Sequence, residues 1–204
     1  MVIEKGNNPF DLFEVFQEAF PGEISSIFKV YLQFNHLKRV YRKGWLKSGI
    51  SPQICESDAD HSLGVAFLGL ILAQKYAPSL NQAKLLKMAI IHELGETVVG
   101  DITPDEDYPT RKQEEFSVVQ KILHDLPNSR ELVGLYSEFE NKSSPEGKFM
   151  KEIDSLEMVF QALIYEKEFN FDSIQFLESV QKKIMNPHLK TVFEQIKKIK
   201  KLES

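Results

Sequence analysis

The chain has 204 residues, of which 42% are apolar, and its 25 basic and 30 acidic residues give a net charge of −5. These values exclude a disordered, collagen-like or membrane protein. The acidic balance argues against a general nucleic-acid binder, because such binding depends on Lys and Arg side chains that neutralise phosphates. At this length we expect one domain, over residues 1–204.

The cysteine content and the N-terminal segment indicate the compartment. The single Cys55 excludes an internal disulfide and fits a reducing environment. Residues 1–16 lack the uninterrupted apolar core of a signal peptide, and no stretch of about 18 uncharged apolar residues follows. We therefore expect a cytoplasmic protein.

Apolar residues recur three and four apart along most of the chain, which predicts an all-α fold. In chain order, the expected helices span residues 10–20, 23–38, 61–77, 81–99, 110–125, 129–140, 145–169, 172–185 and 187–201. Residues 41–60 and 100–109 lack this periodicity and are rich in Gly, Pro, Ser and Asp. We expect both stretches to be loops, which commonly carry functional residues on a helical scaffold.

The helix expected at residues 145–169 has the clearest start. Ser144 is a suitable N-cap, Pro145 suits the first turn, and Glu146 lies near the positive end of the helix. One apolar face is formed by Phe149, Ile153, Leu156, Val159, Phe160 and Leu163. This pattern is typical of a helix that packs on a core.

Residues 84–99 are apolar almost all round, which predicts a buried central helix, yet they include His92, Glu93 and Glu96. Buried ionised groups require partners. In a continuous helix His92 and Glu96 share a face, and Glu93 lies about 100° from His92, so that an imidazole and a carboxylate reach one point. The spacing alone fits either a metal-binding corner or a hydrogen-bonded His–Glu pair.

Two further residues complete a possible ligand set. His61 follows the acidic cap segment 57–60 and opens an apolar helix beside a loop, whereas Asp154 interrupts the apolar face of the helix at 145–169. Periodicity does not decide whether Asp154 is functional or simply exposed. Two histidines and two carboxylates are ligand types of a divalent transition metal that keeps open positions. The other histidines lie in polar contexts and are expected to be surface or structural: His36, His124 and His188.

The order of His61, His92-Glu93 and Asp154 resembles the H…HD…D signature of HD-domain metal-dependent phosphohydrolases, with HE in place of HD. The similarity extends to the group of this family that includes the human HD domain-containing protein 2 and the bacterial 5′-deoxynucleotidases. The similar segments are residues 37–45, 56–66, 92–104 and 143–166. The resemblance covers about residues 30–168 and implies a single-domain HD-type helical bundle, with an N-terminal helix and C-terminal helices appended.

The resemblance implies that His61, His92, Glu93 and Asp154 bind one divalent metal ion. Such a ligand set suits Mn, Co, Fe, Ni, Zn or Mg, and the sequence does not choose among them. Glu93 stands where the family pattern has Asp, so its carboxylate is one methylene farther from the backbone. The metal or the helix would have to shift by about 1 Å. Catalysis slows when the residues of a site lie more than about 0.5 Å from their productive positions.

The resemblance also implies catalytic and substrate-binding residues. Glu96 and Asp101 match two acids of the family pattern that are not ligands, and Glu96 is placed to polarise the attacking water. Gly100 can end the helix in a left-handed turn that returns Asp101 to the site. Arg42 and Trp45 match substrate-side residues: Arg42 offers a fork of donors for phosphate, and Trp45 either stacks on the nucleotide or is a packed indole.

The implied activity is hydrolysis of the 5′-phosphate of (deoxy)ribonucleoside monophosphates by a metal-activated water. The partner is then a small nucleotide, without polymeric nucleic acid or membrane, and the family implies a homodimer. Two alternatives stay open: an HD hydrolase acting on another nucleotide phosphate, and a nucleotide- or metal-binding HD protein with little or no catalysis.

Lys148 and Lys151 also match the family segments, and we interpret both as solvated lysines.

Overall fold

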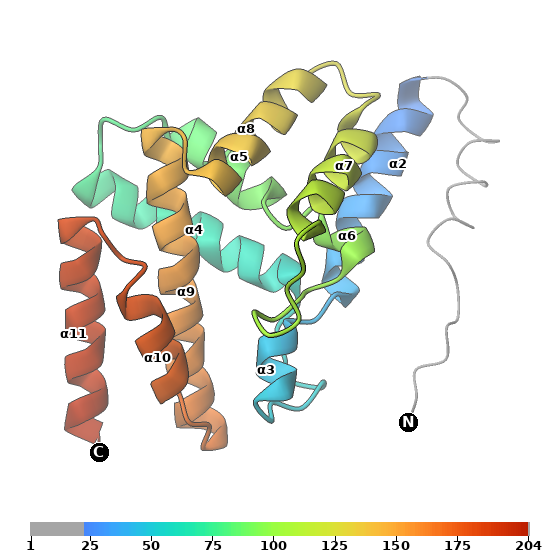
Figure 1. The fold of residues 1–204 in the computed structure, drawn as a ribbon. Coiled ribbons are helices and arrows are strands. Elements are labelled where there is room, and N and C mark those ends of the chain that lie inside the picture. The colour runs from blue at the N-terminus through green and yellow to red at the C-terminus, as the bar shows by residue number, and fades with distance from the viewer. Residues whose placement is uncertain (1–22, 204) are drawn as a thin grey trace.

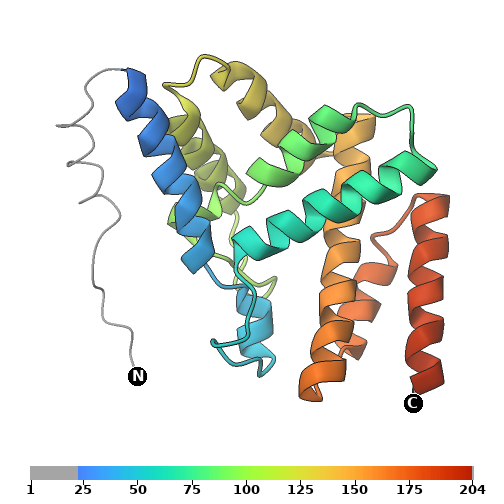
Figure 2. The same ribbon diagram turned by 180° about the vertical axis from the view of Figure 1, so that it is seen from behind.

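Residues 23–203 are described by this structure, a computed structural model in which helices are joined by loops (Figures 1 and 2). In chain order the elements are α2 (Glu23–His36), the 3₁₀ helix η1 (Leu37–Arg39), α3 (Lys43–Lys47), α4 (Asp58–Tyr76), α5 (Gln82–Ile91), α6 (Glu96–Val99), α7 (Arg111–Leu123), α8 (Ser129–Asn141), α9 (Pro145–Phe169), α10 (Ile174–Gln181) and α11 (Pro187–Glu203). The helix expected at residues 10–20 lies outside the described part of the chain. The all-α prediction is confirmed, because the described residues form no strand beyond an isolated bridge between Tyr41 and Ser57.

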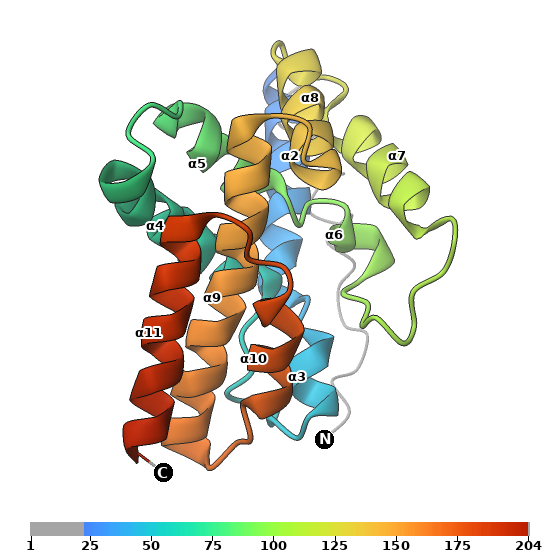
Figure 3. The same ribbon diagram turned by 60° about the vertical axis from the view of Figure 1, so that its left-hand side comes forward.

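Helix α9 is the centre of the bundle and packs against α4, α5, α8, α10 and α11. Helices α10 and α11 flank α9 on one side of the molecule, and α2, α6 and α7 lie on the other side (Figures 1 and 3). The core between α4, α5 and α9 includes the fully buried side chains of Leu85, Met88, Met150, Ile153 and Leu156. Between residues 23 and 203, no helix is long and apolar enough to cross a membrane.

The helix predicted at residues 145–169 is confirmed as α9. Ser144 is its N-cap and accepts a hydrogen bond from the Gly147 backbone N–H at 3.0 Å, and Pro145 occupies the first turn. The helix ends at Phe169, and its C-cap residue Asn170 adopts the left-handed conformation at φ 55°. The start was predictable because the cap and the proline are local signals that need no tertiary partner.

The single helix predicted over residues 81–99 is wrong. Helix α5 ends at Ile91, and α6 begins only at Glu96. Between them the backbone is tightened by bonds three residues apart, from Leu94 N to Ile91 O at 3.0 Å and from Glu96 N to Glu93 O at 2.9 Å. Gly95 lies in this break and packs against α7, since a Cβ there would lie 3.1 Å from the Cα atom of Glu115. The side chains after Ile91 are therefore redirected where the predicted ligands occur.

The loop predicted at residues 41–60 is only partly correct. It contains the short helix α3, and α4 already begins at Asp58. Ser57 and Asp60 form a capping box: the Ser57 hydroxyl accepts from the Asp60 N–H at 3.2 Å, and the Asp60 carboxylate accepts from the Ser57 N–H at 2.9 Å. This cap fixes the first turn of α4 and with it the position of His61.

Candidate metal and catalytic site

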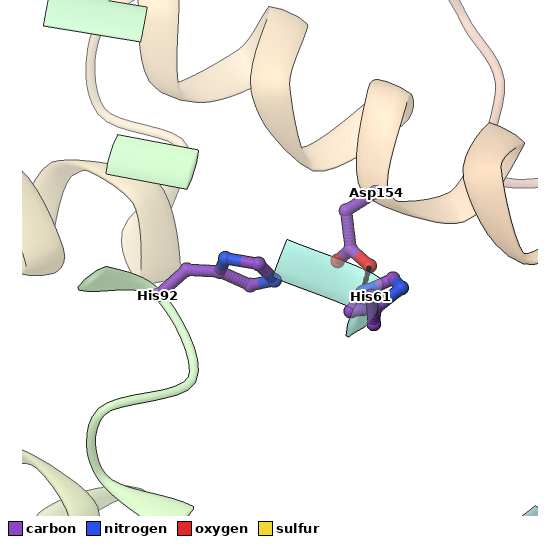
Figure 4. Close-up of side chains that lie close together, drawn as sticks. All are labelled: His61, His92 and Asp154. Carbon is purple, nitrogen blue, oxygen red and sulfur yellow. Dashed lines mark hydrogen bonds and ion pairs between the residues drawn. The ribbon is translucent and has the colours of Figure 1, made fainter. Parts of the chain in front are cut away.

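The structure brings His61, His92 and Asp154 together from three separate elements (Figure 4). His61 lies in the first turns of α4, His92 directly follows α5, and Asp154 lies within α9. The Nε2 atom of His61 is 3.1 Å from Oδ1 of Asp154, and the ring of His92 points toward this pair. One ligand atom from each residue lies within 4.8 Å of the others, so the three could hold a metal ion.

The hydrogen bonds of the two imidazoles test whether the site fits a cation. His92 Nδ1 donates to the carbonyl of Ala89 at 2.8 Å, and His61 Nδ1 lies 2.7 Å from Oε2 of Glu157. Both rings therefore turn Nε2 into the site, and Nε2 of His92 is buried without a hydrogen-bond partner. Metal-binding histidines are held in this way by a carbonyl or carboxylate on the second ring nitrogen, so the residues fit a divalent ion.

The electrostatics of the site also favour a positive charge at this point. Burial lowers the pKa of His61, but its hydrogen bonds to Asp154 and Glu157 outweigh burial and raise the pKa to about 10. Burial opposes ionisation of Asp154, yet the hydrogen bond from His61 and the charge of Lys151 hold the pKa of Asp154 well below its usual range. The surrounding carboxylates thus stabilise whatever cation lies between them.

Glu93, the fourth predicted ligand, connects the histidines to Arg42. Its Oε1 atom lies 3.2 Å from Nε2 of His92 and 3.5 Å from Nε2 of His61. The same atom accepts a hydrogen bond from Nη1 of Arg42 at 2.9 Å. Burial raises the pKa of Glu93, but His92 and Arg42 lower the pKa well below its usual value, so the carboxylate is ionised.

The two predicted catalytic acids lie beside this group on different parts of the chain. Glu96 begins α6, and Asp101 follows Gly100. Gly100 ends the helix with a positive φ of 81°, as expected, but its ψ of 160° lies outside the left-handed helical region. The Asp101 carboxylate accepts a hydrogen bond from the backbone N–H of Lys43. Burial and then the charge of Glu93 raise the pKa of Glu96 well above its usual value, which is the behaviour of a carboxylate in a crowded acidic site.

The guanidinium of Arg42 lies within 4 Å of three acidic side chains, and Trp45 follows it in α3. Arg42 Nη1 is 3.8 Å from Asp58 and from Asp101, in addition to its contact with Glu93. Trp45 is only 2% exposed and its indole N–H donates to Glu56 at 2.6 Å. The geometry therefore favours the packed-indole interpretation of Trp45 over stacking on a fully accessible ring face.

Two neighbouring cavities open around these residues. A polar cavity of 270 Å³ is lined by Glu96, Lys151 and Asp154 among others. A second cavity of 340 Å³ is lined by Trp45, Phe176 and other residues. Arg42, Asp101 and Ile102 line both. One ligand can therefore place a charged group in the polar cavity and a less polar group in the second cavity, with Arg42 between them.

Several neighbours of the candidate site were missed or misjudged from the sequence. Lys151 is not solvated as interpreted: its amine pairs with Glu140 at 2.8 Å and lies 4.1 Å from the Phe139 ring centroid, whereas Lys148 is exposed as expected. Glu157 was not identified, although its position three residues after Asp154 on the buried side of α9 was a usable signal. The other missed neighbours are Asp58, Arg111 and Glu115.

The remaining histidines lie away from the site. The side chain of His124 is 83% exposed, and His188 stacks on Tyr76 with the ring centroids 5.2 Å apart. Neither His124, His188 nor His36 joins the group that could hold an ion. Their positions fit the surface or structural roles expected for them.

The absence of a side chain at Gly64 leaves space for the Glu157 carboxylate, which contacts His61. A Cβ at Gly64 would lie 3.0 Å from Cδ and 3.1 Å from Cγ of Glu157, and nearer still to Oε1. Gly64→Ala is therefore expected to displace the Glu157 carboxylate and to weaken Mn²⁺ binding about 10- to 100-fold, as for other lost partners of metal-binding histidines. Titration calorimetry measures the affinity.

Gly134→Ala is the matched control for this variant. Gly134 also lies within a helix, but nothing lies within 4 Å of a Cβ at this position. This substitution should stabilise the fold by up to about 1 kcal/mol through helix propensity and leave metal affinity unchanged. Equal Mn²⁺ affinities for Gly64→Ala and Gly134→Ala would contradict the role assigned to Glu157.

An all-α bundle whose separate helices bring two histidines and an aspartate to one point, beside further buried acids and an arginine, has the architecture of an HD domain. Comparison with known proteins agrees: the HD domain model matches residues 34–197, and this chain belongs to that family. The family predicted from the order of the motifs is therefore confirmed.

Individual relatives extend the similarity over most of the chain. The 5′-deoxynucleotidase hdd1 of Schizosaccharomyces pombe is 35% identical over 144 residues, covering 67% of this chain and 70% of that protein. The 5′-deoxynucleotidase HDDC2 of Dictyostelium discoideum is 29% identical over 191 residues, covering 84% and 98%. A solved structure of a conserved hypothetical protein from Pyrococcus furiosus has a TM-score of 0.70 at 31% identity, covering 84% of this chain and 99% of that one.

Proposed function

We propose that this protein is a metal-dependent phosphohydrolase that removes the 5′-phosphate from deoxyribonucleoside monophosphates. The observation that carries the proposal is the convergence of the Nε2 atoms of His61 and His92 with Asp154, next to the buried acid Glu96. The relatives named 5′-deoxynucleotidases support the substrate class.

We assign His61, His92, Glu93 and Asp154 to one divalent metal ion, whose identity among Mn, Co, Fe, Ni, Zn and Mg stays open. When bound, such an ion supplies Lewis acidity toward phosphate and lowers the pKa of water. The protein's contribution is to orient the two imidazoles through Ala89 and Glu157, and to offset the cation's charge with carboxylates.

The remaining residues act on the phosphate and on protons. The guanidinium of Arg42 contacts Glu93 through Nη1, and its other donors are available for phosphate oxygens as charge develops. Glu96 accepts the proton of the attacking water, because its Oε2 atom is buried without a partner. Asp101 assists at the 5′-oxygen, and Trp45 forms part of the wall of the second cavity, where the nucleoside would lie.

Phosphate release from a panel of nucleotides tests the proposal. The purified protein, stripped with a chelator and reloaded with Mn²⁺, Co²⁺, Mg²⁺ or Zn²⁺, is expected to release inorganic phosphate from deoxyribonucleoside monophosphates, and the chelator is expected to abolish release. Protein that binds one of these metals and releases no phosphate from any nucleotide would contradict it and favour the non-catalytic alternative.

The same panel separates the enzymatic alternative. Cyclic and polyphosphorylated nucleotides are included, and they should be hydrolysed more slowly than the monophosphates. A site for two metals would use additional histidines, but among residues 23–203 the three others lie away from this group. The buried acid Glu96 is costly to keep without a catalytic use, which disfavours a pure binding protein.

We also infer that the protein forms a homodimer through α4. Leu63, Phe67 and Ile71 are four residues apart on this helix and are 72%, 64% and 44% exposed. Exposed apolar stripes of this kind mark interaction surfaces. Phe67→Asp is expected to convert a dimer to a monomer in light-scattering measurements, and a dimer of unchanged mass in this variant would contradict the location. The cytoplasmic location stays a prediction.

A further inference from the structure

The guanidinium group of Arg111 joins the parts of the chain that hold the acids of the site. Its Nη2 atom donates to Oε1 of Glu96 at 3.0 Å, and its Nε atom donates to Oε1 of Glu115 at 2.6 Å. Its Nη1 atom donates to the carbonyl of Ile102 at 3.4 Å. One side chain at the start of α7 thus contacts α6, the loop that carries Asp101, and its own helix.

The two oxygens of Glu96 have different surroundings. Oε1 is bonded to Arg111, whereas Oε2 is buried and has no hydrogen-bond partner. Because a carboxylate can rotate about its terminal torsion, a single neighbour that fixes one oxygen also decides where the other points. The planar fork of an arginine imposes this geometry better than the point charge of a lysine.

The charges around Glu96 make such a partner necessary. Glu93, Asp58 and Asp101 all act on Glu96 with like charge. The nearby cation Arg42 forms its hydrogen bond to Glu93. Arg111 donates to Glu96 at 3.0 Å and so opposes this repulsion.

Arg111 is itself held by Glu115, which is 6% exposed and packs against Gly95 at the break between α5 and α6. A Cβ at Gly95 would lie 2.7 Å from the Cβ of Glu115, so the close approach of α7 to this break depends on glycine. The arrangement couples the backbone that carries His92 and Glu93 to the side chain that holds Glu96.

We propose that Arg111 is a positioning residue for Glu96: it fixes Oε1 so that the unpartnered Oε2 faces the reacting water. This inference rests on the proposed phosphohydrolase function. It differs from a role in phosphate binding, because Arg111 directs all three of its nitrogen atoms to protein acceptors.

The experiment compares Arg111→Gln, Arg111→Lys, Glu96→Gln and the double variant Glu96→Gln/Arg111→Gln with the wild type. Arg111→Gln is expected to lower kcat about 10- to 100-fold, the cost of a misplaced catalytic group, with KM and Mn²⁺ affinity unchanged. The kcat of Arg111→Lys should lie between the values for the wild type and Arg111→Gln, because lysine keeps the charge but not the planar fork of donors. The double variant should be no slower than Glu96→Gln alone. Lys121→Gln, which removes an exposed cation from the same helix, is the control.

Two kinetic results would overturn the proposal. One is a raised KM with kcat retained, which would make Arg111 a phosphate ligand, and the other is an additive loss in the double variant. A crystal structure of Arg111→Lys provides a readout that does not depend on activity: the Glu96 carboxylate should turn from its wild-type position. An unmoved carboxylate overturns the inference, whereas a wild type without phosphatase activity refutes only the proposed function.

Discussion

Glu96→Gln is expected to lower kcat for deoxyribonucleoside monophosphates by about 100- to 10,000-fold, the range for loss of a general base or acid. The amide has the same shape and its oxygen can still accept from Arg111, but it cannot take a proton from water. Because Glu96 is not a proposed ligand, the Mn²⁺ affinity from calorimetry should match that of the wild type. The measurement is the steady-state release of phosphate at saturating metal.

Glu178→Gln is the control for this substitution. Glu178 lies on α10 and is exposed, and it lines neither cavity of the site. Its loss should leave kcat unchanged. Near-normal turnover of Glu96→Gln at saturating metal would show that another group accepts the proton, and Asp101 would then be the residue to test.

His92→Gln is expected to weaken Mn²⁺ binding by more than about 100-fold, since loss of an outer partner alone costs 10- to 100-fold. His92 is 5% exposed, and its buried Nε2 makes no hydrogen bond and faces the Glu93 carboxylate at 3.2 Å. A ligand present at 100 times its Kd stabilises a fold by about 2.7 kcal/mol. The wild-type melting temperature should therefore rise on addition of Mn²⁺, and that of His92→Gln should not.

His124→Gln is the matched control, because the His124 side chain is exposed and its Nδ1 pairs only with the adjacent Asp125. It should bind Mn²⁺ and melt like the wild type. The ring of His92 also packs on Phe139, with centroids 4.9 Å apart, so the metal-free His92→Gln protein is compared with itself when metal is added. An undiminished rise in its melting temperature would show that His92 is not a ligand.

The helices were predictable where local signals and periodicity agree. Helix α9 begins after Ser144 as predicted, because its cap bond to Gly147 lies within the same turn. The break after Ile91 was not predictable in this way. An apolar run looks the same whether the backbone bonds span three or four residues, and the packing of Gly95 on Glu115 depends on a helix later in the chain.

The site was predictable in its central residues and less so in its surroundings. His92 stood out as a polar residue within an apolar segment and His61 as a histidine that opens one, whereas Asp154 was distinguished by an order of the three that resembles a known family. Arg111 and Glu157 did not stand out in the sequence, because charged residues on helices are usually solvated. Arg111 contacts Glu96 and Glu157 contacts His61, which are 15 and 96 residues away in sequence.

Anomalous diffraction from crystals grown with Mn²⁺ tests the metal site most directly. We expect a peak between Nε2 of His61, Nε2 of His92 and the Asp154 carboxylate, within coordination distance of each ligand atom. The absence of a peak at this point in metal-loaded protein would contradict the site. So would a peak between Glu56 and Glu157, which with His61 form a second group within residues 23–203 that could hold an ion.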